Sequence, residues 1–212
     1  MRYRAVIFDL DGVICHTDRF HFAAWKQIAQ MLGLHFDESL GDQLRGIGRM
    51  ESFEIILAYN HKAMSDEDKA RYISQKNDLY RALLQNMTPA DLDGDVRRTL
   101  DALRGAGCKL AIGSSSKNTK FILDHLGLGM FFDAVSDGTD ITHPKPDPEV
   151  FLTAAARLKL PPGGCLVVED AQSGIAAAAA GGMDSAALGD AVNSPQATYR
   201  LSKLSDILQY VL

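Results

Sequence analysis

Two carboxylates near the amino terminus have the spacing and the setting that phosphoryl chemistry would use. Asp9 and Asp11 directly follow the apolar run Ala5–Phe8 and precede Gly12. In an extended segment both side chains would share a face, but a turn at Gly12 would aim them differently. One carboxylate would then attack phosphorus while the other moves a proton. Taken alone, the segment is equally well explained as a strand-end turn, because Asp and Gly both favour turns.

A group of small polar residues follows a second apolar run, Leu110–Ile112, and precedes a helix-like segment. Hydroxyls and amides at the start of a helix bind anions well. The candidate residues are Ser114, Ser115, Ser116, Lys117 and Asn118. For Ser116 or Asn118 alone, capping of the helix is the simpler explanation. Lys117 adds a cation that capping does not require.

Lys145 lies between two prolines, Pro144 and Pro146, which stiffen the backbone around it. A lysine in a loop is usually a solvated surface group. Its rigid setting before a helix-like segment instead favours an electrostatic role, in which Lys145 neutralises a transferring phosphoryl group and the nearby carboxylates.

An acidic pair, Glu169 and Asp170, ends the apolar run Leu166–Val168. Mg²⁺ prefers a few carboxylates together with substrate oxygens and water. Asp9 and Asp170, a backbone carbonyl and a phosphate oxygen would form such a shell. The structural alternative is that Asp170 caps a helix, which Mg²⁺ coordination by its other oxygen would not exclude.

Short apolar runs that suit strands buried on both faces recur along the chain. They are Ala5–Phe8, Leu110–Ile112, Ala134–Val135, Leu166–Val168 and Ala186–Leu188. Helix-like segments separate the later runs, at residues 95–105, 118–126, 148–158 and 174–180. Alternating strands and helices predict an α/β fold with a doubly wound, Rossmann-like parallel sheet. No G-x-G-x-x-G follows the first strand, which disfavours a dinucleotide site.

Residues 17–88 break this alternation, because they contain helix-like segments without strands. Helices are predicted at residues 20–32, 40–44, 50–59 and 66–84. We therefore expect a core domain of residues 1–16 and 89–212 and an inserted helical cap domain of residues 17–88. Ligands bind at the carboxyl ends of the strands in open parallel sheets, so an insert leaving that edge would act as a lid.

The bulk composition excludes several classes of protein. The formal net charge of −5 gives no global attraction to nucleic acid or to anionic membranes. No apolar run approaches the length of a membrane span, and the first residues run into a strand-like segment rather than a signal peptide. Three scattered cysteines do not form a disulfide framework. We expect a cytoplasmic monomer that acts on a small molecule.

The four polar segments occur in the order that defines the haloacid dehalogenase (HAD) superfamily, which the chain resembles over nearly the whole core. The matching motifs are Asp9-Leu10-Asp11-Gly12-Val13, Ser114, Lys145-Pro146 and Glu169-Asp170. The insert after the first motif looks like the helical cap of that superfamily. Within it, the cap resembles that of the β-phosphoglucomutases, in pieces that include Thr17, His21-Phe22, Ala24-Trp25, Leu44 to Arg49, Ser52 and Lys76-Asn77.

The resemblance implies a role for each matching residue. Asp9 would be the nucleophile and Asp11 the general acid and base. The Mg²⁺ ligands would be Asp9, the Asp11 carbonyl, Glu169 and Asp170, while Ser114 and Lys145 would hold the reacting phosphoryl group. The second, distal phosphate would be bound by Arg49, Ser116, Lys117 and Asn118, and the sugar by Gly46, Ser52 and Lys76.

Further substrate contacts are implied for Thr17, Trp25, Arg45, Ile47 and Ser115, and His21 would position Asp11 and couple cap closure to catalysis. Each cap residue also has an explanation without function. Arg49 and Lys76 would be solvated helix charges, Trp25 would be cap core, and His21 would be a packed histidine.

The resemblance implies interconversion of β-D-glucose 1-phosphate and D-glucose 6-phosphate through an aspartyl-phosphate enzyme. Glucose 1,6-bisphosphate would be the intermediate and activator, and Mg²⁺ the cofactor. The alternative is a HAD-type phosphatase that hydrolyses sugar phosphates or other small phosphomonoesters, because the core chemistry is shared. A non-enzymatic phosphate sensor is disfavoured, since binding alone needs neither a nucleophile nor a proton shuttle.

Overall fold

The computed structural model describes residues 2–44 and 47–212, and the chain divides into two compact units. The first unit comprises Met1–His16 with Met87–Leu212, and the second comprises Thr17–Asn86. The second unit ends at Asn86 rather than at residue 88. Thr88 instead belongs to the turn that begins a 3₁₀ helix, Pro89–Asp91, because its amide donates to the carboxylate of Asp91 at 2.9 Å.

The first unit is built around a parallel sheet with the strand order β3-β2-β1-β4-β5-β6. The strands are β1 (Ala5–Phe8), β2 (Lys109–Gly113), β3 (Ala134–Ser136), β4 (Cys165–Glu169), β5 (Asp184–Ala187) and β6 (Tyr199–Arg200). Strand β1 lies at the centre, where Ile7 pairs with Ala111 on one side and with Val167 on the other. The predicted α/β, doubly wound class is therefore confirmed.

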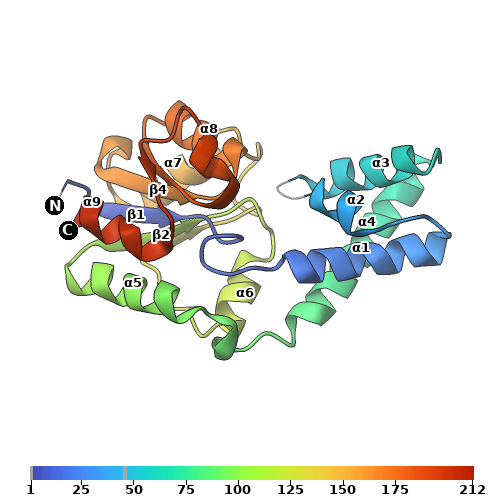
Figure 1. Ribbon diagram of the computed structural model, residues 1–212, viewed down its shortest axis with the longest axis horizontal. Coiled ribbons are helices and arrows are strands. Elements are labelled where there is room, and N and C mark those ends of the chain that lie inside the picture. The colour runs from blue at the N-terminus through green and yellow to red at the C-terminus, as the bar shows by residue number, and fades with distance from the viewer. Residues whose placement is uncertain (1, 45–46) are drawn as a thin grey trace. The chain divides into compact units, whose positions relative to one another are not determined.

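Helices cover both faces of this sheet, which explains why its strands read as continuous apolar runs. The helices are α5 (Gly94–Gly105), α6 (Thr119–His125), α7 (Glu149–Leu158), α8 (Gln172–Ala180) and α9 (Leu208–Val211), with 3₁₀ turns at Pro162–Gly164, Gly189–Asn193 and Leu204–Ile207. Figure 1 shows α7 and α8 on one side of the sheet and α5 on the other. On the α7 side, Phe151 and Val150 pack against Ile7 and Val167.

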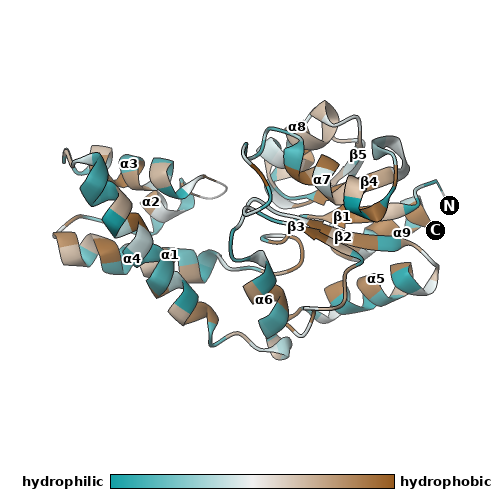
Figure 2. Cartoon of the chain, turned by 180° about the vertical axis from the view of Figure 1, so that it is seen from behind, coloured by the Kyte–Doolittle hydropathy of each residue, from teal (hydrophilic) through white to brown (hydrophobic). Residues whose placement is uncertain are grey.

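The central strands form the apolar middle of this unit, as the brown ribbons of β1 and β2 show in Figure 2. All four residues of β1 are completely buried. The three cysteines, Cys15, Cys108 and Cys165, are free and buried.

The second unit is helical, with α1 (Asp18–Leu32), α2 (Glu38–Asp42), α3 (Arg49–Tyr59) and α4 (Asp66–Leu84). Its core is an aromatic and aliphatic cluster in which the rings of Trp25 and Phe53 stack with their centroids 5.6 Å apart. Helix α1 ends at Gly33, whose backbone is left-handed with φ +63° and closes the last turn through bonds to Ala29 and Gln30. Within residues 2–44 and 47–212, no helix is long and apolar enough to cross a membrane.

Candidate active site

The loop that follows β1 turns back on itself immediately after Asp9. The Asp9 amide still donates to the Val168 carbonyl at 2.9 Å, so Asp9 lies where the sheet ends. Gly12 donates its amide to Cys15 at 2.7 Å and adopts a left-handed backbone with φ +84°. The turn that Gly12 was expected to make is therefore present, at the carboxyl end of the central strand.

Lys145 lies between two buried carboxylates that come from different strands. Its Nζ atom is 2.5 Å from Oδ1 of Asp9 and 2.5 Å from Oε1 of Glu169. The side chains are 9%, 11% and 1% exposed for Lys145, Asp9 and Glu169 respectively, so the three charges are almost excluded from water. The Lys145 ammonium lies 4.6 Å from the centroid of the Phe151 ring, and the peptide bond to Pro146 is cis. Lys145 is thus part of a buried charge cluster and not a solvated surface group.

Glu169 is fixed at both of its carboxylate oxygens. While Oε1 accepts from Lys145, Oε2 accepts from the Ala171 amide at 2.9 Å. Glycine at position 174 makes room for this carboxylate, since a Cβ there would lie 1.9 Å from Oε1. Gly174 was not singled out in the sequence, although a glycine inside the first turn of an apolar helix, where it is unfavourable, was a signal for a close contact.

Asp170 lies against the turn that carries Asp11. A Cβ on Gly12 would lie 1.9 Å from Oδ2 of Asp170, so only glycine lets this carboxylate come so close to the backbone between Asp11 and Val13. The segments after β1 and β4 therefore bring Asp9, the Asp11–Gly12 backbone and Asp170 together at one edge of the sheet.

Burial and charge act in opposite directions on the acids of this cluster. Burial raises the pKa of Asp9 well above its usual value, the ammonium of Lys145 opposes that rise, and Glu169 and Asp11 add to it. Burial also raises the pKa of Asp170 to about 7, with a further contribution from Glu169. Burial would lower the pKa of Lys145, but Asp9 and Glu169 reverse the direction, so the net pKa of Lys145 is raised and it stays an ammonium.

The donor set at this edge fits Mg²⁺. Among the described residues, no group of three or more Asp, Glu, His or Cys side chains is arranged to hold a metal ion. Mg²⁺ does not require such a group, because it is usually bound by one or two carboxylates with water and phosphate oxygens. Asp9, Asp170 and the backbone beside Gly12 supply that smaller set of hard oxygen ligands, since the absence of a Cβ on Gly12 lets the Asp170 carboxylate lie against this turn.

The loop of residues 114–118 follows β2 and reaches the same edge. The Ser114 amide donates to Ser136 at 3.1 Å, and the Ser114 and Ser116 hydroxyls accept from the amides of Ser116 and Asn118, each at 3.2 Å. The hydroxyls therefore shape the loop, and a hydroxyl that accepts a bond still carries a proton to donate to an anion. Ser115 and Lys117 are exposed, and Ser114 and Asn118 are buried.

In the helical unit, two basic residues contact each other away from water. Nζ of Lys76 lies 2.7 Å from Nδ1 of His21, and Lys76 is only 1% exposed. The ring of Tyr80 stacks on that of His21 with their centroids 4.0 Å apart, and the Tyr80 hydroxyl donates to the Thr17 hydroxyl at 3.0 Å. Burial first, and then the positive charges of Lys76 and Arg49, lower the pKa of His21 well below its usual value. His21 is therefore neutral at physiological pH.

The remaining predicted cap residues lie in or beside α1 and α3. Trp25 is buried in the cap core, as its structural explanation expected, yet its ring also lies 5.2 Å from the ammonium of Lys76. Ser52 is buried and donates to the Ile47 carbonyl at 3.5 Å. Partial burial lowers the pKa of Arg49. Arg45 and Gly46, which were also predicted to bind substrate, lie outside the described residues.

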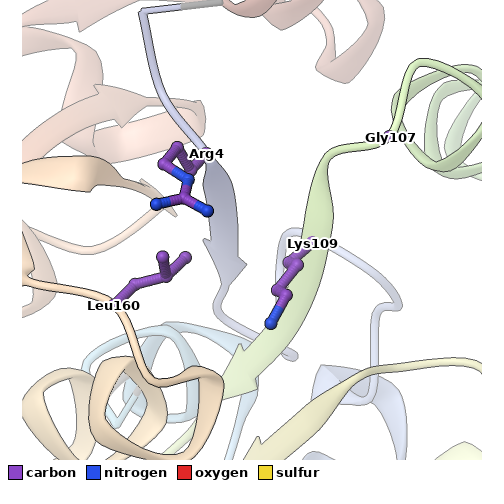
Figure 3. Close-up of a pocket in the computed structure, with 4 residues that line it drawn as sticks. All are labelled: Arg4, Gly107, Lys109 and Leu160. Carbon is purple, nitrogen blue, oxygen red and sulfur yellow. The ribbon is translucent and has the colours of Figure 1, made fainter.

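A separate pocket lies at the opposite edge of the sheet, where β1 and β2 begin (Figure 3). It is lined by Arg4, Gly107, Lys109 and Leu160, none of which was predicted to act in catalysis. The Lys109 ammonium donates to the Leu158 carbonyl at 3.2 Å and so satisfies the end of α7.

A sheet edge with a buried aspartate–lysine–glutamate cluster, together with a helical insert after the first strand, defines an enzyme of the HAD class. Residues 3–182 match the family model described as haloacid dehalogenase-like hydrolase. The chain belongs to this family, as the four motifs predicted.

Curated relatives of the chain include both mutases and phosphatases. It is 40% identical to a β-phosphoglucomutase of Bacillus subtilis, over 88% of this chain and 83% of that protein. It is 35% identical to the fructose-1-phosphate phosphatase YqaB of Escherichia coli, over 86% of this chain and 95% of that protein. A solved structure of a β-phosphoglucomutase from Clostridium difficile matches with a TM-score of 0.88 and 33% identity, and covers 99% of this chain and 95% of that one.

Proposed function

We propose that this enzyme interconverts β-D-glucose 1-phosphate and D-glucose 6-phosphate, through a phosphorylated Asp9 and a glucose 1,6-bisphosphate intermediate. The observation that supports the phosphorylation of Asp9, the step that a mutase shares with a phosphatase, is the contact of Asp9 with Lys145 inside a buried cluster that Glu169 completes. A carboxylate at a strand end beside a fixed ammonium is suited to attack on phosphorus, because the ammonium would offset the negative charge of the transferring group.

In the first half of the proposed reaction, the 6-hydroxyl of β-glucose 1-phosphate forms a bond to the phosphorus on phosphorylated Asp9 as the bond from Asp9 to phosphorus breaks, and that hydroxyl gives its proton to Asp11. The product is glucose 1,6-bisphosphate, which must reorient before the next step. In the second half, an oxygen of Asp9 forms a bond to the phosphorus at C1 as the bond from phosphorus to the C1 oxygen breaks, and Asp11 returns the proton to that oxygen. Glucose 6-phosphate leaves, Asp9 is again phosphorylated, and both residues are back in their starting states.

The proposed Mg²⁺ site is formed by Asp9, Asp170 and the backbone beside Gly12. The bound ion would offset the negative charge of the phosphate oxygens, and it would favour the ionised form of Asp9. Glu169 was predicted to be a further ligand. Its two hydrogen-bonded oxygens favour a role in holding Lys145 and the start of α8.

Basic groups in the helical unit and, separately, in the 114–118 loop support a second phosphate-binding site on the enzyme. A phosphatase for monoesters needs one anion site, whereas a mutase must hold the phosphate at either end of the sugar. Lys76 is a buried ammonium, Arg49 is partly buried, and Lys117 is exposed at the loop. The proposal assigns the distal phosphate to Ser116, Lys117 and Asn118, and it keeps Arg49, Ser52 and Lys76 as proposed substrate contacts of the helical unit.

The alternative function is hydrolysis of a sugar phosphate, which the 35% identity to a fructose-1-phosphate phosphatase favours. The two activities share the phosphorylation of Asp9 and differ in what accepts the phosphoryl group. In a mutase a sugar hydroxyl accepts it, and in a phosphatase water does.

The experiment that separates them uses purified enzyme with Mg²⁺, β-glucose 1-phosphate and a trace of glucose 1,6-bisphosphate. Glucose 6-phosphate and free phosphate are measured in the same reaction. The mutase proposal requires glucose 6-phosphate to be the main product. Predominant release of free phosphate, with β-glucose 1-phosphate or with fructose 1-phosphate as substrate, would replace it with the phosphatase.

A further inference from the structure

The segment after β3 lies directly against the 114–118 loop. The Ser136 carbonyl accepts from the Ser114 amide at 3.1 Å, and the Gly138 amide donates to the Ser116 carbonyl at 3.1 Å. These two bonds join the segment to the loop on both sides of Ser115. The position of the loop backbone is therefore set by the segment after β3 as well as by β2, the strand that the loop follows.

Gly138 allows this approach because it has no side chain. A Cβ at Gly138 would lie 2.2 Å from the Ser115 carbonyl oxygen and 3.0 Å from the Lys117 amide nitrogen. Real Cβ atoms do not come so close to backbone atoms, so a larger residue would push the loop away. Gly138 is not among the glycines with a positive φ, so the need for glycine here is one of space and not of backbone conformation.

Asp137 fixes the segment next to Gly138. It is only 1% exposed, and its Oδ1 accepts from the Thr139 amide at 2.8 Å and from the Thr139 hydroxyl at 2.5 Å. Its Oδ2 lies 3.3 Å from the ammonium of Lys120 on α6. Asp137 thus links the segment to α6, the helix that follows the 114–118 loop.

Asp140 fixes the other end of the segment. Its two oxygens accept from the guanidinium of Arg157 on α7 at 2.7 and 2.8 Å, and Oδ2 also accepts from the Asp137 amide at 3.0 Å. Such two-pronged pairs hold geometry well. Arg157 also donates to the Val135 carbonyl within β3. The segment is therefore anchored to α6, to α7 and to the sheet.

We propose that Asp137 and Gly138 are positioning residues, which set the place of the Ser115–Lys117 backbone and through it the affinity for a phosphate group bound by that loop. This inference rests on the proposed function, which assigns the distal phosphate to the loop. Neither residue touches the reacting atoms. Their loss should therefore weaken the binding of a phosphosugar and spare the phosphorylation of Asp9 by a donor without a second anionic group.

The test compares Gly138→Ala with Gly105→Ala, a control in α5 whose added Cβ would meet nothing within 4 Å. Two readouts are taken from each variant. The first is the pair of KM and kcat for β-glucose 1-phosphate, and the second is the rate at which acetyl phosphate phosphorylates Asp9. Misplacement of a binding group by a fraction of an ångström should raise KM about tenfold in Gly138→Ala, with kcat and the acetyl phosphate rate within about twofold of the parent enzyme.

Two results would overturn the inference. One is an unchanged KM in Gly138→Ala, and the other is an equal fall of both the phosphosugar and the acetyl phosphate rates, which a general disturbance of the site would cause. If Gly138→Ala does not fold, Asp137→Asn and Lys120→Met are judged by the same two criteria, with thermal unfolding to follow their stability.

The outcome is separable from that of the proposed function. If the parent enzyme makes no glucose 6-phosphate, the mutase proposal fails, and the comparison is made with the dissociation constant of glucose 1,6-bisphosphate, which carries a second phosphate whichever reaction the enzyme catalyses. A dissociation constant that still rises about tenfold in Gly138→Ala alone would keep the positioning role. An unchanged dissociation constant in Gly138→Ala would reject it.

Discussion

The Nζ atom of Lys145 lies 2.5 Å from Oδ1 of Asp9, although the two residues are 136 positions apart along the chain. The parallel sheet makes this contact possible, because the strands before the two residues end at the same edge. The contact keeps a cation beside the proposed nucleophile before any substrate arrives. Such preorganisation needs little rearrangement when charge develops in the transition state.

Replacement of Lys145 by methionine should abolish most of the activity while leaving substrate binding in the cap intact. Loss of a fixed charge from a buried site lowers kcat by about 10²–10³-fold. Steady-state kinetics of Lys145→Met measure this. Lys109→Met is the matched control, because Lys109 lies at the opposite edge of the sheet and should keep nearly full activity. Similar losses in the two variants would show that Lys145 has no special role.

Substitution of Gly12 by alanine should weaken Mg²⁺ activation, because the new Cβ would displace the Asp170 carboxylate. A left-handed backbone also costs a non-glycine residue about 1 kcal/mol or more of stability. Gly107→Ala controls for that strain, since Gly107 has φ +82° and nothing within 4 Å of the added Cβ. Titration of activity with Mg²⁺ should give a higher half-saturating concentration for Gly12→Ala alone, and equal values would contradict the proposed site.

Metal binding should depend on pH through Asp170. Its folded-state pKa of about 7 exceeds the usual 3.8, so the folded protein without metal binds the proton more tightly than the unfolded chain does. The metal-free protein should therefore lose stability as pH rises from about 4 to about 7. Above about pH 7, Asp170 should cause no further loss of stability.

Mg²⁺ must displace the Asp170 proton below pH 7, so its affinity should rise with pH and level off above about 7. Thermal unfolding with Mg²⁺ or with a chelator, at pH 5.5 and at pH 8, checks both parts. The stabilisation by Mg²⁺ should be larger at pH 8. An equal or larger effect at pH 5.5 would show that Asp170 does not titrate as described.

Replacement of Lys76 by methionine should raise the pKa of His21 toward its usual value, because one of the two positive charges that lower it is removed. Methionine keeps much of the packing of the lysine stem against Trp25 and Tyr80. We expect the KM for the phosphosugar to rise about tenfold, as for loss of one charge-assisted hydrogen bond.

The pKa of His21 is measured by NMR titration of its ring, and Lys69→Met serves as the control on the same helix. Lys69 pairs with Glu54 and Asp66 at the surface, so its loss should leave both His21 and KM unchanged. No change at His21 in Lys76→Met would mean that Lys76 does not contribute to its lowered pKa and that burial and Arg49 account for it.

The fold was largely predictable because its strands are buried on both faces. Four of the five apolar runs that were predicted as strands lie wholly within the sheet, and the fifth, Ala186–Leu188, overlaps β5 but extends one residue past its end at Ala187. The helix predicted at residues 66–84 has those bounds. The strand β6, Tyr199–Arg200, was not predicted, since two polar or half-buried residues at the sheet edge leave no apolar run. Short edge strands are held by their neighbours more than by their own sequence.

The site was predictable in its residue types and not in its contacts. Motif order brought Asp9, Lys145 and Glu169 into one hypothesis, but nothing in the sequence distinguishes an ammonium between two carboxylates from one beside a single acid. The same holds for Gly138. The sequence Asp137-Gly138-Thr139-Asp140 is typical of a turn, and only the fold shows that this turn lies against Ser115.

The central claim is that Asp9 itself carries the phosphoryl group, and chemical trapping tests it most directly. The enzyme is incubated with glucose 1,6-bisphosphate and Mg²⁺, quenched, and reduced with borohydride, which converts an aspartyl phosphate to homoserine. We predict homoserine at position 9 in the peptide that contains Phe8 and Leu10, and none in Asp9→Asn. Homoserine at another aspartate, or full turnover by Asp9→Asn, would contradict the account.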